Sequence, residues 1–312
     1  MLKNKTTLSI NPTYLCNFRC DFCYLTPEQL ADKQKLDLNR LGDMLDDCIK
    51  YGAEVNHVDL YGGEVGLLPE DYLNEIHNMV TERFDATFNV VTNLYKIHPY
   101  FLREDVDLSV SYDFEARERH EAVLSNMISI PKPIHILMLA SPTLIKMDVE
   151  KMISTFNSIR NVESVEIKPY SSNQANQLPV SDEEYEDFVW KWIESPAEKD
   201  FEFTNEESLI DVVRGETNAF SDDHIYITPN GKFAALEFDE NDNEFFEEYN
   251  SYVGYIKWSI KEKYKVHRNK FCGSCEYLGK CLTEHYRDVK ALDPTCNGYK
   301  RLIDRYRDRI HN

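Results

Sequence analysis

The sequence predicts an α/β fold: a partial barrel of six strand-helix units, followed by a small C-terminal domain made of a β-hairpin and helices. From residue 8 to about residue 170, short β-branched runs alternate with amphipathic helical patterns, which is typical of βα units in a parallel sheet. The chain has 312 residues, 42% of them hydrophobic, so it can bury a large core and a smaller one. A turn signal and a group of cysteines mark the last part of the chain. We therefore expect two domains, at residues 1–214 and 215–312.

Six strands and a well-defined first helix are expected in the barrel. Apolar residues recur at helical spacing before Gly52, which is expected to end the helix; they are Leu41, Met44, Leu45, Cys48 and Ile49. Cys48 lies on this buried stripe, so we expect an inert core thiol there. The strands are expected at Leu8–Ile10, His57–Leu60, Thr87–Val91, Asp107–Val110, Ile134–Leu139 and Ser164–Ile167.

Two more helices are expected after the sixth strand. Ser181–Glu184 and Thr204–Glu207 each match the capping-box pattern of a helix start. The first of these helices has its large apolar residues on one side, so its many carboxylates are expected to face outward. Those apolar residues are Tyr185, Phe188, Val189 and Trp192.

The second domain is expected to open with a hairpin. Two short runs, Ile225–Thr228 and Phe233–Leu236, flank Pro229–Lys232, whose Asn-Gly pair is a strong hairpin signal. The last segment, Gly298–Ile310, has helical periodicity and is expected to pack back on the barrel. Its apolar positions are Leu302, Ile303, Tyr306 and Ile310.

Charge is spread unevenly along the chain. The formal net charge is −20, so duplex nucleic acid is not expected as a direct partner. Residues 181–250 hold 22 acidic and 4 basic side chains, whereas residues 257–312 hold 14 basic and 7 acidic ones. This asymmetry indicates either two solvated faces of opposite sign or an acidic lip for a cationic substrate.

Neither a membrane span nor a secretion signal is expected. No apolar run reaches the roughly 18 to 20 residues that a membrane helix needs, and Met1–Lys5 leads into a strand pattern without a signal-peptide core. We therefore expect a soluble, cytoplasmic protein with no membrane partner. In that compartment the eight cysteines are better explained as metal ligands than as disulfides.

Three cysteines, Cys16, Cys20 and Cys23, follow the first strand with the spacing Cys-x3-Cys-x2-Cys. Thiolates bind both zinc and iron-sulfur clusters. A structural zinc site usually has four protein ligands, and the nearest further candidates are Cys48 and His57. Three ligands on one loop favour an iron-sulfur cluster with one open iron. The three cysteines are therefore the candidate catalytic and metal-binding residues.

This motif, with Phe22 before its last cysteine and Tyr24 after it, resembles the signature of the radical S-adenosylmethionine (SAM) superfamily. The end of the second strand, with Gly62, Gly63 and Glu64, is similar to that family's Gly-Gly-Glu element, which receives the methionyl amine of SAM. The resemblance implies a partial (β/α)6 barrel of the TIM type, with chemistry at the C-terminal strand ends, where these motifs fall. It also implies a [4Fe-4S] cluster on the three cysteines, whose open iron chelates SAM.

Further strand ends fit the same family more weakly. Thr92 and Asn93 resemble its ribose-contacting element, and Ser111 and Asp113 resemble its fourth-strand element. Taken singly, each is also typical of an ordinary turn or loop cap. The fifth and sixth strand ends would be Leu137–Ser141 and Lys168–Ser172.

The resemblance implies that SAM is cleaved reductively and that a 5′-deoxyadenosyl radical abstracts hydrogen from a substrate. The protein then supplies orientation and excludes water, while the cofactor supplies the difficult step. Glycines at positions 62 and 63 are expected to let the backbone approach a ligand closely, and Glu64 to offer its carboxylate to the cationic amine.

The C-terminal cysteines resemble the second auxiliary cluster of the SPASM domains found in many radical SAM enzymes; they are Cys272, Cys275, Cys281 and Cys296. A full SPASM domain has further cysteines at the positions that Leu236 and His285 occupy here. The resemblance therefore implies a shortened, twitch-type domain with one fully ligated auxiliary [4Fe-4S] cluster, suited to electron transfer. Four thiolates also suit zinc, and His285 is either a ligand or a structural residue.

Three functions remain open at this stage. The favoured one is oxidative modification of a ribosomal peptide by cross-linking, desaturation or excision. The second is dehydrogenation or epimerisation of a small polar metabolite such as an amino sugar, and the third is a non-catalytic iron-sulfur sensor or assembly protein. The resemblance implies a flavodoxin or ferredoxin as electron donor, for which basic residues between Lys257 and Lys270 offer either a docking face or simply a solvated helix. No leader-binding domain is expected before the first strand, but this does not exclude a peptide substrate, because a separate protein can bind the leader.

Overall fold

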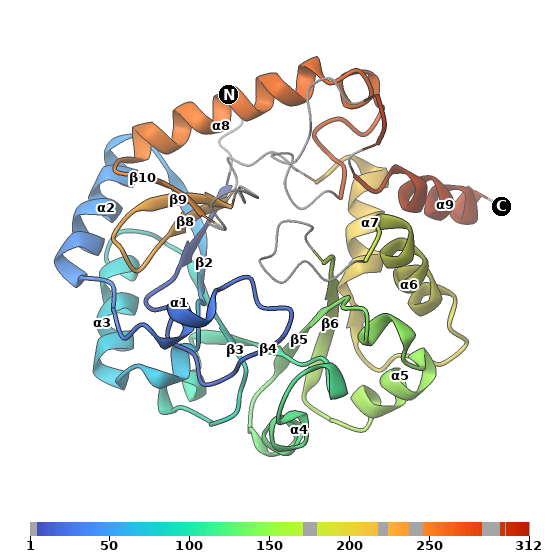
Figure 1. The fold of residues 1–312 in the computed structure, drawn as a ribbon, viewed down its shortest axis with the longest axis horizontal. Coiled ribbons are helices and arrows are strands. Elements are labelled where there is room, and N and C mark those ends of the chain that lie inside the picture. The colour runs from blue at the N-terminus through green and yellow to red at the C-terminus, as the bar shows by residue number, and fades with distance from the viewer. Residues whose placement is uncertain are drawn as a thin grey trace.

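The fold is described from a computed structural model, which describes residues 5–170, 180–217, 224–236, 246–282, 294–296 and 298–311. Within these residues, ten strands form one curved sheet, and the helices lie on its outer face (Figure 1). The strand order is β10-β9-β8-β1-β2-β3-β4-β5-β6-β7, so strands β1 to β7 are neighbours in sequence and in space. None of the described helices is long and apolar enough to cross a membrane.

All six predicted strands are present, and neighbouring ones pair in parallel. Most of them extend one or more residues beyond the predicted ends. The strands are β1 (Lys5–Ile10), β2 (Glu54–Leu60), β3 (Thr87–Thr92), β4 (Val106–Ser111), β5 (Ile134–Leu139) and β6 (Val162–Lys168). The helices that connect them are α1 (Pro27–Ala31), α2 (Leu38–Lys50), α3 (Glu70–Thr81), α4 (His120–Ser129) and α5 (Val149–Asn157).

Helix α2 packs on the sheet largely as its periodicity predicts. The first four positions of its apolar stripe are fully buried, including Cys48, whose pKa is raised to about 12 by burial. A thiol in this environment is unreactive, which agrees with the predicted core role. The prediction is wrong for Ile49, which lies in the last turn of the helix and is 46% exposed.

The two predicted capping boxes have different outcomes. Ser181 caps α6 (Asp182–Glu194) as expected, because its hydroxyl accepts from the backbone of Glu184, whose side chain accepts from the backbone of Ser181. The second box is wrong: α7 (Thr204–Arg214) begins at the predicted cap residue, and Phe203 takes the N-cap position. Phe203 is extended because it belongs to a short strand, β7 (Glu202–Phe203), that pairs with β6.

The acidic helix α6 faces the basic C-terminal helix α9 (Lys300–His311). The predicted apolar side of α6 is buried, but its carboxylates do not all face solvent as expected. Glu186 is only 5% exposed and pairs with Arg301, which also contacts Glu183 and Asp187. Burial raises the pKa of Glu186, and the Arg301 guanidinium opposes this effect. The two oppositely charged segments of the sequence thus partly neutralise each other.

The predicted hairpin is present as β8 (His224–Ile227) and β9 (Phe233–Leu236), which pair antiparallel. Gly231 in its turn has a φ of +68°, a conformation that favours glycine. An unpredicted strand, β10 (Phe246–Tyr249), pairs with β9, and helix α8 (Tyr252–Arg268) follows. Because β8 pairs in parallel with β1, the hairpin continues the barrel sheet. The domain boundary near residue 215 therefore stays a proposal.

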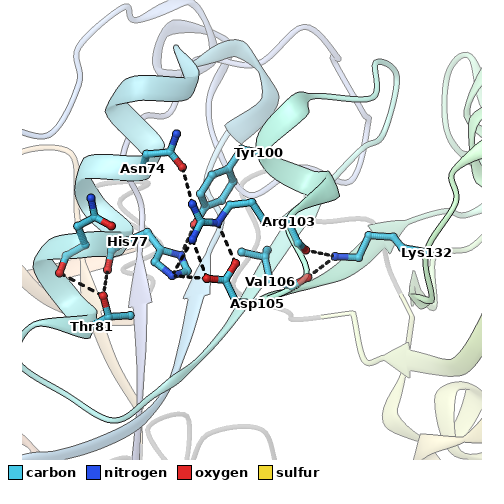
Figure 2. A network of polar contacts seen from close by, with 9 residues as sticks. Asn74, His77, Thr81, Tyr100, Arg103, Asp105, Val106 and Lys132 are labelled. Atoms are coloured by element: carbon cyan, nitrogen blue, oxygen red, sulfur yellow. Dashed lines mark hydrogen bonds and ion pairs between the residues drawn. The ribbon is translucent and has the colours of Figure 1, made fainter.

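A polar network joins α3 to the start of β4 (Figure 2). Arg103 forms an ion pair with Asp105 at 2.6 Å and donates to Asn74 at 2.9 Å. His77 is 4% exposed, lies 3.3 Å from an Asp105 carboxylate oxygen and stacks on Phe88 with ring centroids 4.1 Å apart. Burial and the Arg103 charge together lower the pKa of His77. The native protein therefore keeps this ring neutral.

We expect His77 to make stability depend on pH. The unfolded chain binds a proton at histidine below about pH 6.5, whereas the native state resists it, so stability is lost as the pH falls below that value. Between pH 7 and pH 5.5 the free energy of unfolding should fall by about 1 kcal/mol more in the wild type than in a His77→Gln variant. Urea denaturation at the two pH values measures this difference. An equal loss of unfolding free energy in the two proteins would contradict a neutral His77 in the native state.

Candidate active site

The three cysteines of the predicted motif lie on the loop between β1 and α1. The backbone N–H of Cys16 donates to the carbonyl of Leu30 in α1 at 3.1 Å. The guanidinium of Arg19 donates to the carbonyls of Cys16 and Phe18, at 2.8 and 2.7 Å. These bonds hold the loop in a fixed shape above the end of the sheet.

A cavity of about 250 Å³ lies between this loop and the C-terminal ends of the strands. All three cysteines line it, as do residues that follow or end β2, β3, β4, β5 and β6. Of the predicted site residues, the cavity brings together Cys16, Cys20, Cys23, Phe22, Tyr24, Gly62, Gly63, Thr92, Asn93 and Ser111. Neither Glu64 nor Asp113 lines it.

The three thiols of the predicted motif are protonated in the absence of a metal. Burial raises the pKa of Cys16, Cys20 and Cys23 to about 11 each, so the metal-free thiols are protonated at neutral pH. Binding of a metal or cluster displaces such protons. The backbone N–H of Phe18 points at the sulfur of Cys16 at 3.4 Å, and Arg117 lies 3.6 Å from the sulfur of Cys20. Both contacts favour the thiolate form.

The two glycines after β2 are required by a close approach to the cysteine loop. A Cβ on Gly63 would lie 2.2 Å from the carbonyl oxygen of Tyr14 and 2.3 Å from that of Leu15. Gly62 has a φ of +149°, and its N-terminal neighbour Tyr61 also lines the cavity. The glycines were expected to let the backbone approach a ligand closely. In the structure they let it approach the backbone of the cysteine loop.

Glu64 is a structural carboxylate in this geometry. It is 5% exposed, and one oxygen accepts from the Thr92 hydroxyl at 2.7 Å and from the Gly66 N–H at 2.8 Å. The other oxygen accepts from the Asn93 N–H at 2.8 Å. Burial raises the pKa of Glu64, and these three bonds oppose that effect. The carboxylate is bonded to the neighbouring turns and is not part of the cavity lining, and its direct contact with the SAM amine stays a prediction.

Removing the Glu64 carboxylate should loosen the wall and so weaken ligand binding indirectly. Glu64→Ala would leave three donors without a partner, on buried Thr92 and Asn93 and on half-buried Gly66, which should cost about 3 kcal/mol of stability. Chemical denaturation and calorimetric titration with SAM would measure the two effects. The exposed Glu75 of α3 supplies the control, because Glu75→Ala should change neither. A fully stable Glu64→Ala protein that had lost SAM affinity would support the direct-contact hypothesis.

Thr92 and Asn93 connect the end of β3 to both neighbouring loops. Besides its bond to Glu64, the Thr92 hydroxyl accepts from the Leu94 N–H at 3.0 Å. The Asn93 amide donates to the Asn17 side chain at 2.8 Å and lies 4.0 Å from the sulfur of Cys16. This turn therefore positions the first cysteine as well as lining the cavity.

Arg117 lines the cavity but was not predicted. Asp113, fully buried, accepts from the Leu139 N–H at 2.5 Å and from Arg117 Nε at 2.7 Å. The guanidinium also lies over the ring of Phe22, 5.1 Å from its centroid. Asp113 thus acts by orienting Arg117, and no sequence motif distinguishes this arginine from the other basic residues.

Two of the weaker strand-end predictions fall partly in the cavity. Leu137, Leu139 and Lys168 line it, and Lys168 also forms an ion pair with Glu166 at 2.7 Å. Positions 171 and 172 of the sixth strand end lie outside the described residues.

The four C-terminal cysteines line a second, small cavity, together with apolar side chains that include Phe271, Tyr277 and Leu278. Asn269, which ends α8, accepts from the backbone of Phe271 and Cys272 at 2.9 and 2.8 Å and so shapes the first cysteine turn. These four thiols are the ones predicted to ligate the auxiliary cluster. Position 285 is outside the described residues, and among those described no three Cys, His, Asp or Glu side chains converge as ligands of a single ion.

The sequence matches no protein-family model and no curated protein. The fold is similar to that of native anSMEcpe with bound AdoMet, with a TM-score of 0.72, 12% identity and 98% of each chain covered. It is also similar to SuiB of Streptococcus suis bound to S-adenosylmethionine, with a TM-score of 0.62, 16% identity, and 90% of this chain and 73% of SuiB covered. SuiB bound to its precursor peptide SuiA aligns with a TM-score of 0.61 and 17% identity, over 90% of this chain and 72% of SuiB. The chain has the partial-barrel fold of radical SAM enzymes, as predicted.

Proposed function

We propose that this protein is a radical SAM enzyme. The observation that carries the proposal is the gathering of Cys16, Cys20 and Cys23 with the Gly62–Gly63 and Thr92–Asn93 segments around one cavity at the strand ends. Three half-buried thiols on one loop suit a [4Fe-4S] cluster that keeps one iron open. When bound, such a cluster supplies the electron that cleaves SAM and yields a 5′-deoxyadenosyl radical.

The cavity offers groups that complement SAM. We assign its carboxylate to Arg117, whose guanidinium Asp113 holds in place. Its amine is assigned to the Gly62–Gly63 backbone, because peptide carbonyls accept hydrogen bonds from ammonium groups. Thr92 and Asn93 are assigned to the ribose. The cavity wall around these groups keeps bulk water away from the reacting atoms.

The second set of cysteines is proposed to bind an auxiliary [4Fe-4S] cluster that transfers electrons. The shared cavity of Cys272, Cys275, Cys281 and Cys296 supports this proposal, and four thiolates leave no iron open for substrate. Zinc is the competing occupant. Metal and sulfide analysis of anaerobically purified protein would distinguish the two occupants. Two clusters would give iron and sulfide contents near eight atoms each per chain, whereas zinc at the second site would give one zinc per chain.

The substrate is proposed to be a peptide that undergoes oxidative modification. In solved structures with this fold, SuiB is bound to its precursor peptide SuiA, and anSMEcpe is bound to AdoMet and the Kp18Cys peptide. An acidic lip for a small cationic metabolite would need free carboxylates on α6, yet Arg301 pairs with three of them. This pairing favours the peptide over the metabolite.

The electron donor is proposed to be a flavodoxin or ferredoxin that docks on α8. Lys257 and Lys261 are exposed there beside Ile260 and Tyr264, which are 50% and 65% exposed, and the helix leads into the Cys272 turn. An acidic carrier would find both charge and apolar contact on this surface. Reduction by flavodoxin that did not slow with added salt would count against docking at α8.

Formation of 5′-deoxyadenosine tests the central proposal. Full-length protein, reconstituted with iron and sulfide without oxygen and reduced with dithionite, should convert SAM to 5′-deoxyadenosine and methionine. The products are measured by liquid chromatography. Absence of 5′-deoxyadenosine from protein with a full iron content would overturn the proposal and favour a sensor or assembly role.

A further inference from the structure

A polar row runs along the concave face of the sheet, below the cysteine cavity toward the N-terminal strand ends. Side chains alternate between the two faces of a strand. In β2, Val58 and Leu60 are fully buried toward the helices, whereas Asp59 lies on the other face with Tyr61, which lines the cavity. Asp59 therefore lies one layer below the cavity on the same face.

The surroundings of Asp59 leave one of its oxygens available. Its Oδ1 accepts from the Asn89 amide at 2.7 Å and lies 3.3 Å from Nε2 of His57. Asn89 is itself fixed by the Ser109 hydroxyl, and His57 by the Thr87 hydroxyl. Oδ2 has no partner among the described residues and is not buried, and the side chain is 21% exposed. The network thus holds Asp59 rigidly with Oδ2 open to the concave face.

This carboxylate is ionised at neutral pH. Burial alone would raise the pKa of Asp59, but the bonds from His57 and Asn89 and the proximity of His224 lower it below its usual range. Asp107 lies two strands away on β4, is exposed and pairs in register with Asn89. The charge of Asp59 is therefore retained.

A second unpaired group lies close by. Asn11, the next residue of this face beyond Ser9, is fully buried, and neither its amide nitrogen nor its oxygen has a partner among the described residues. Ser9 pairs in register with Asp59. A buried amide with both polar atoms unpaired is costly unless a ligand satisfies it. Asp59 thus presents an exposed, charged acceptor that is unused, and Asn11 is an unused polar group that only an inserted ligand group would reach.

We propose that Asp59 and Asn11 form a subsite for a cationic side chain of the substrate, an ammonium or guanidinium group inserted below the cysteine cavity. The inference extends the proposed function, since it gives the peptide a lysine or arginine near the residue that is modified. An ammonium group donates three hydrogen bonds, which suits Asp59 Oδ2 and the Asn11 oxygen together. The positively charged Arg117 at the cavity rim would keep such a group away from the SAM site.

Direct binding tests this subsite without turnover. The probes are an N-acetylated, C-amidated Gly-Lys-Gly tripeptide and the same tripeptide with Nε-acetyl-lysine, titrated into the anaerobically reconstituted full-length protein and followed by calorimetry. The wild type should bind the charged probe about tenfold more tightly than the neutral one, which corresponds to one paired charge. Asp59→Asn should remove this preference. Asp107→Asn makes the same charge change on the same face and should keep it.

Equal binding of the two probes by the wild type, or an undiminished preference in Asp59→Asn, would overturn the subsite. If Asp59→Asn fails to fold, the wild-type carboxyl resonances decide: the charged tripeptide should shift the Asp59 signal in ¹³C NMR, and an unmoved signal would overturn the subsite. Formation of 5′-deoxyadenosine by the wild type is measured separately. A protein that cleaves SAM but ignores charge refutes only the subsite, and one that binds the charged probe but never cleaves SAM refutes only the proposed function.

Discussion

Replacement of Cys23 by alanine is expected to abolish the formation of 5′-deoxyadenosine and to leave the fold intact. Cys23 supplies one of only three thiols that line the cavity, so its loss leaves too few ligands to hold a cluster with one open iron. Loss of groups that merely support a metal ligand already costs about 10- to 100-fold in affinity or activity, so loss of the ligand should exceed that. Iron analysis should show about four fewer atoms per chain, and chromatography should show at least about a hundredfold less product.

Cys48→Ala is the matched control for this variant. Cys48 is fully buried in α2 and lies outside both cysteine cavities, so its removal should cost about 1 kcal/mol of stability and no iron. Cys275→Ala should lose the auxiliary iron and keep the iron at the first site. A Cys23→Ala protein with full iron content and normal product formation would place the active cluster elsewhere.

The barrel was predictable because local sequence and tertiary packing agree there. In β5 the predicted and observed strands coincide, since alternation along Ile134–Leu139 matches a sheet with one face on the helices. Prediction failed where a long-range contact decides the local conformation. Phe203 is extended because it pairs with β6. This pairing places the N-cap of α7 at Phe203, one position before the predicted cap residue Thr204. The strand β10 pairs only with β9, and nothing in its own sequence distinguishes it from a loop.

The cavity residues were predictable to the extent that chemistry depends on residue type and strand position. Parallel strands bring their C-terminal ends to one edge, so the cysteines, the two glycines, the Thr92–Asn93 turn and Ser111 meet there. The position of a residue at a strand end does not predict the direction in which its side chain points. Glu64 and Asp113 stand at the correct strand ends, but each is turned into the wall by backbone donors, from Asn93 and Leu139 respectively. Hydrogen bonds from backbone N–H groups stabilise a buried carboxylate, so the positions of these donors determine which way the side chain turns.

Arg117 shows the opposite case, a cavity residue without a sequence signal. It follows β4 by several residues, in a loop with no recognisable motif, and Asp113 holds its side chain at the cavity. Asp113, which the sequence motif singles out, thus positions Arg117, which no motif singles out. The same relation holds for Glu64, which positions the Thr92–Asn93 turn. The wall behind the cavity is therefore as important to the site as the residues that line it.

Gly63→Ala should expose how tightly this wall is built. The new methyl group would lie 2.2 and 2.3 Å from the carbonyl oxygens of Tyr14 and Leu15, and backbone atoms cannot move aside as a flexible side chain can. The bonds from the Gly63 and Glu64 N–H groups to Thr13 and Leu15 hold the two segments at this distance. Displacement of the cysteine loop should cost about 3 kcal/mol of stability. Because the loop carries all three ligands, the iron content at the first site should fall as well.

Gly52→Ala separates this steric effect from the general cost of replacing a glycine. Gly52 has a φ of +78°, yet a Cβ there would meet no atom within 4 Å. The substitution should therefore cost about 1 kcal/mol through backbone strain alone and leave the iron content unchanged. Urea denaturation and iron analysis of both variants give the comparison. If Gly63→Ala lost no more stability than Gly52→Ala and kept its iron, the close contact between the β2 turn and the cysteine loop would not be what holds the ligands in place.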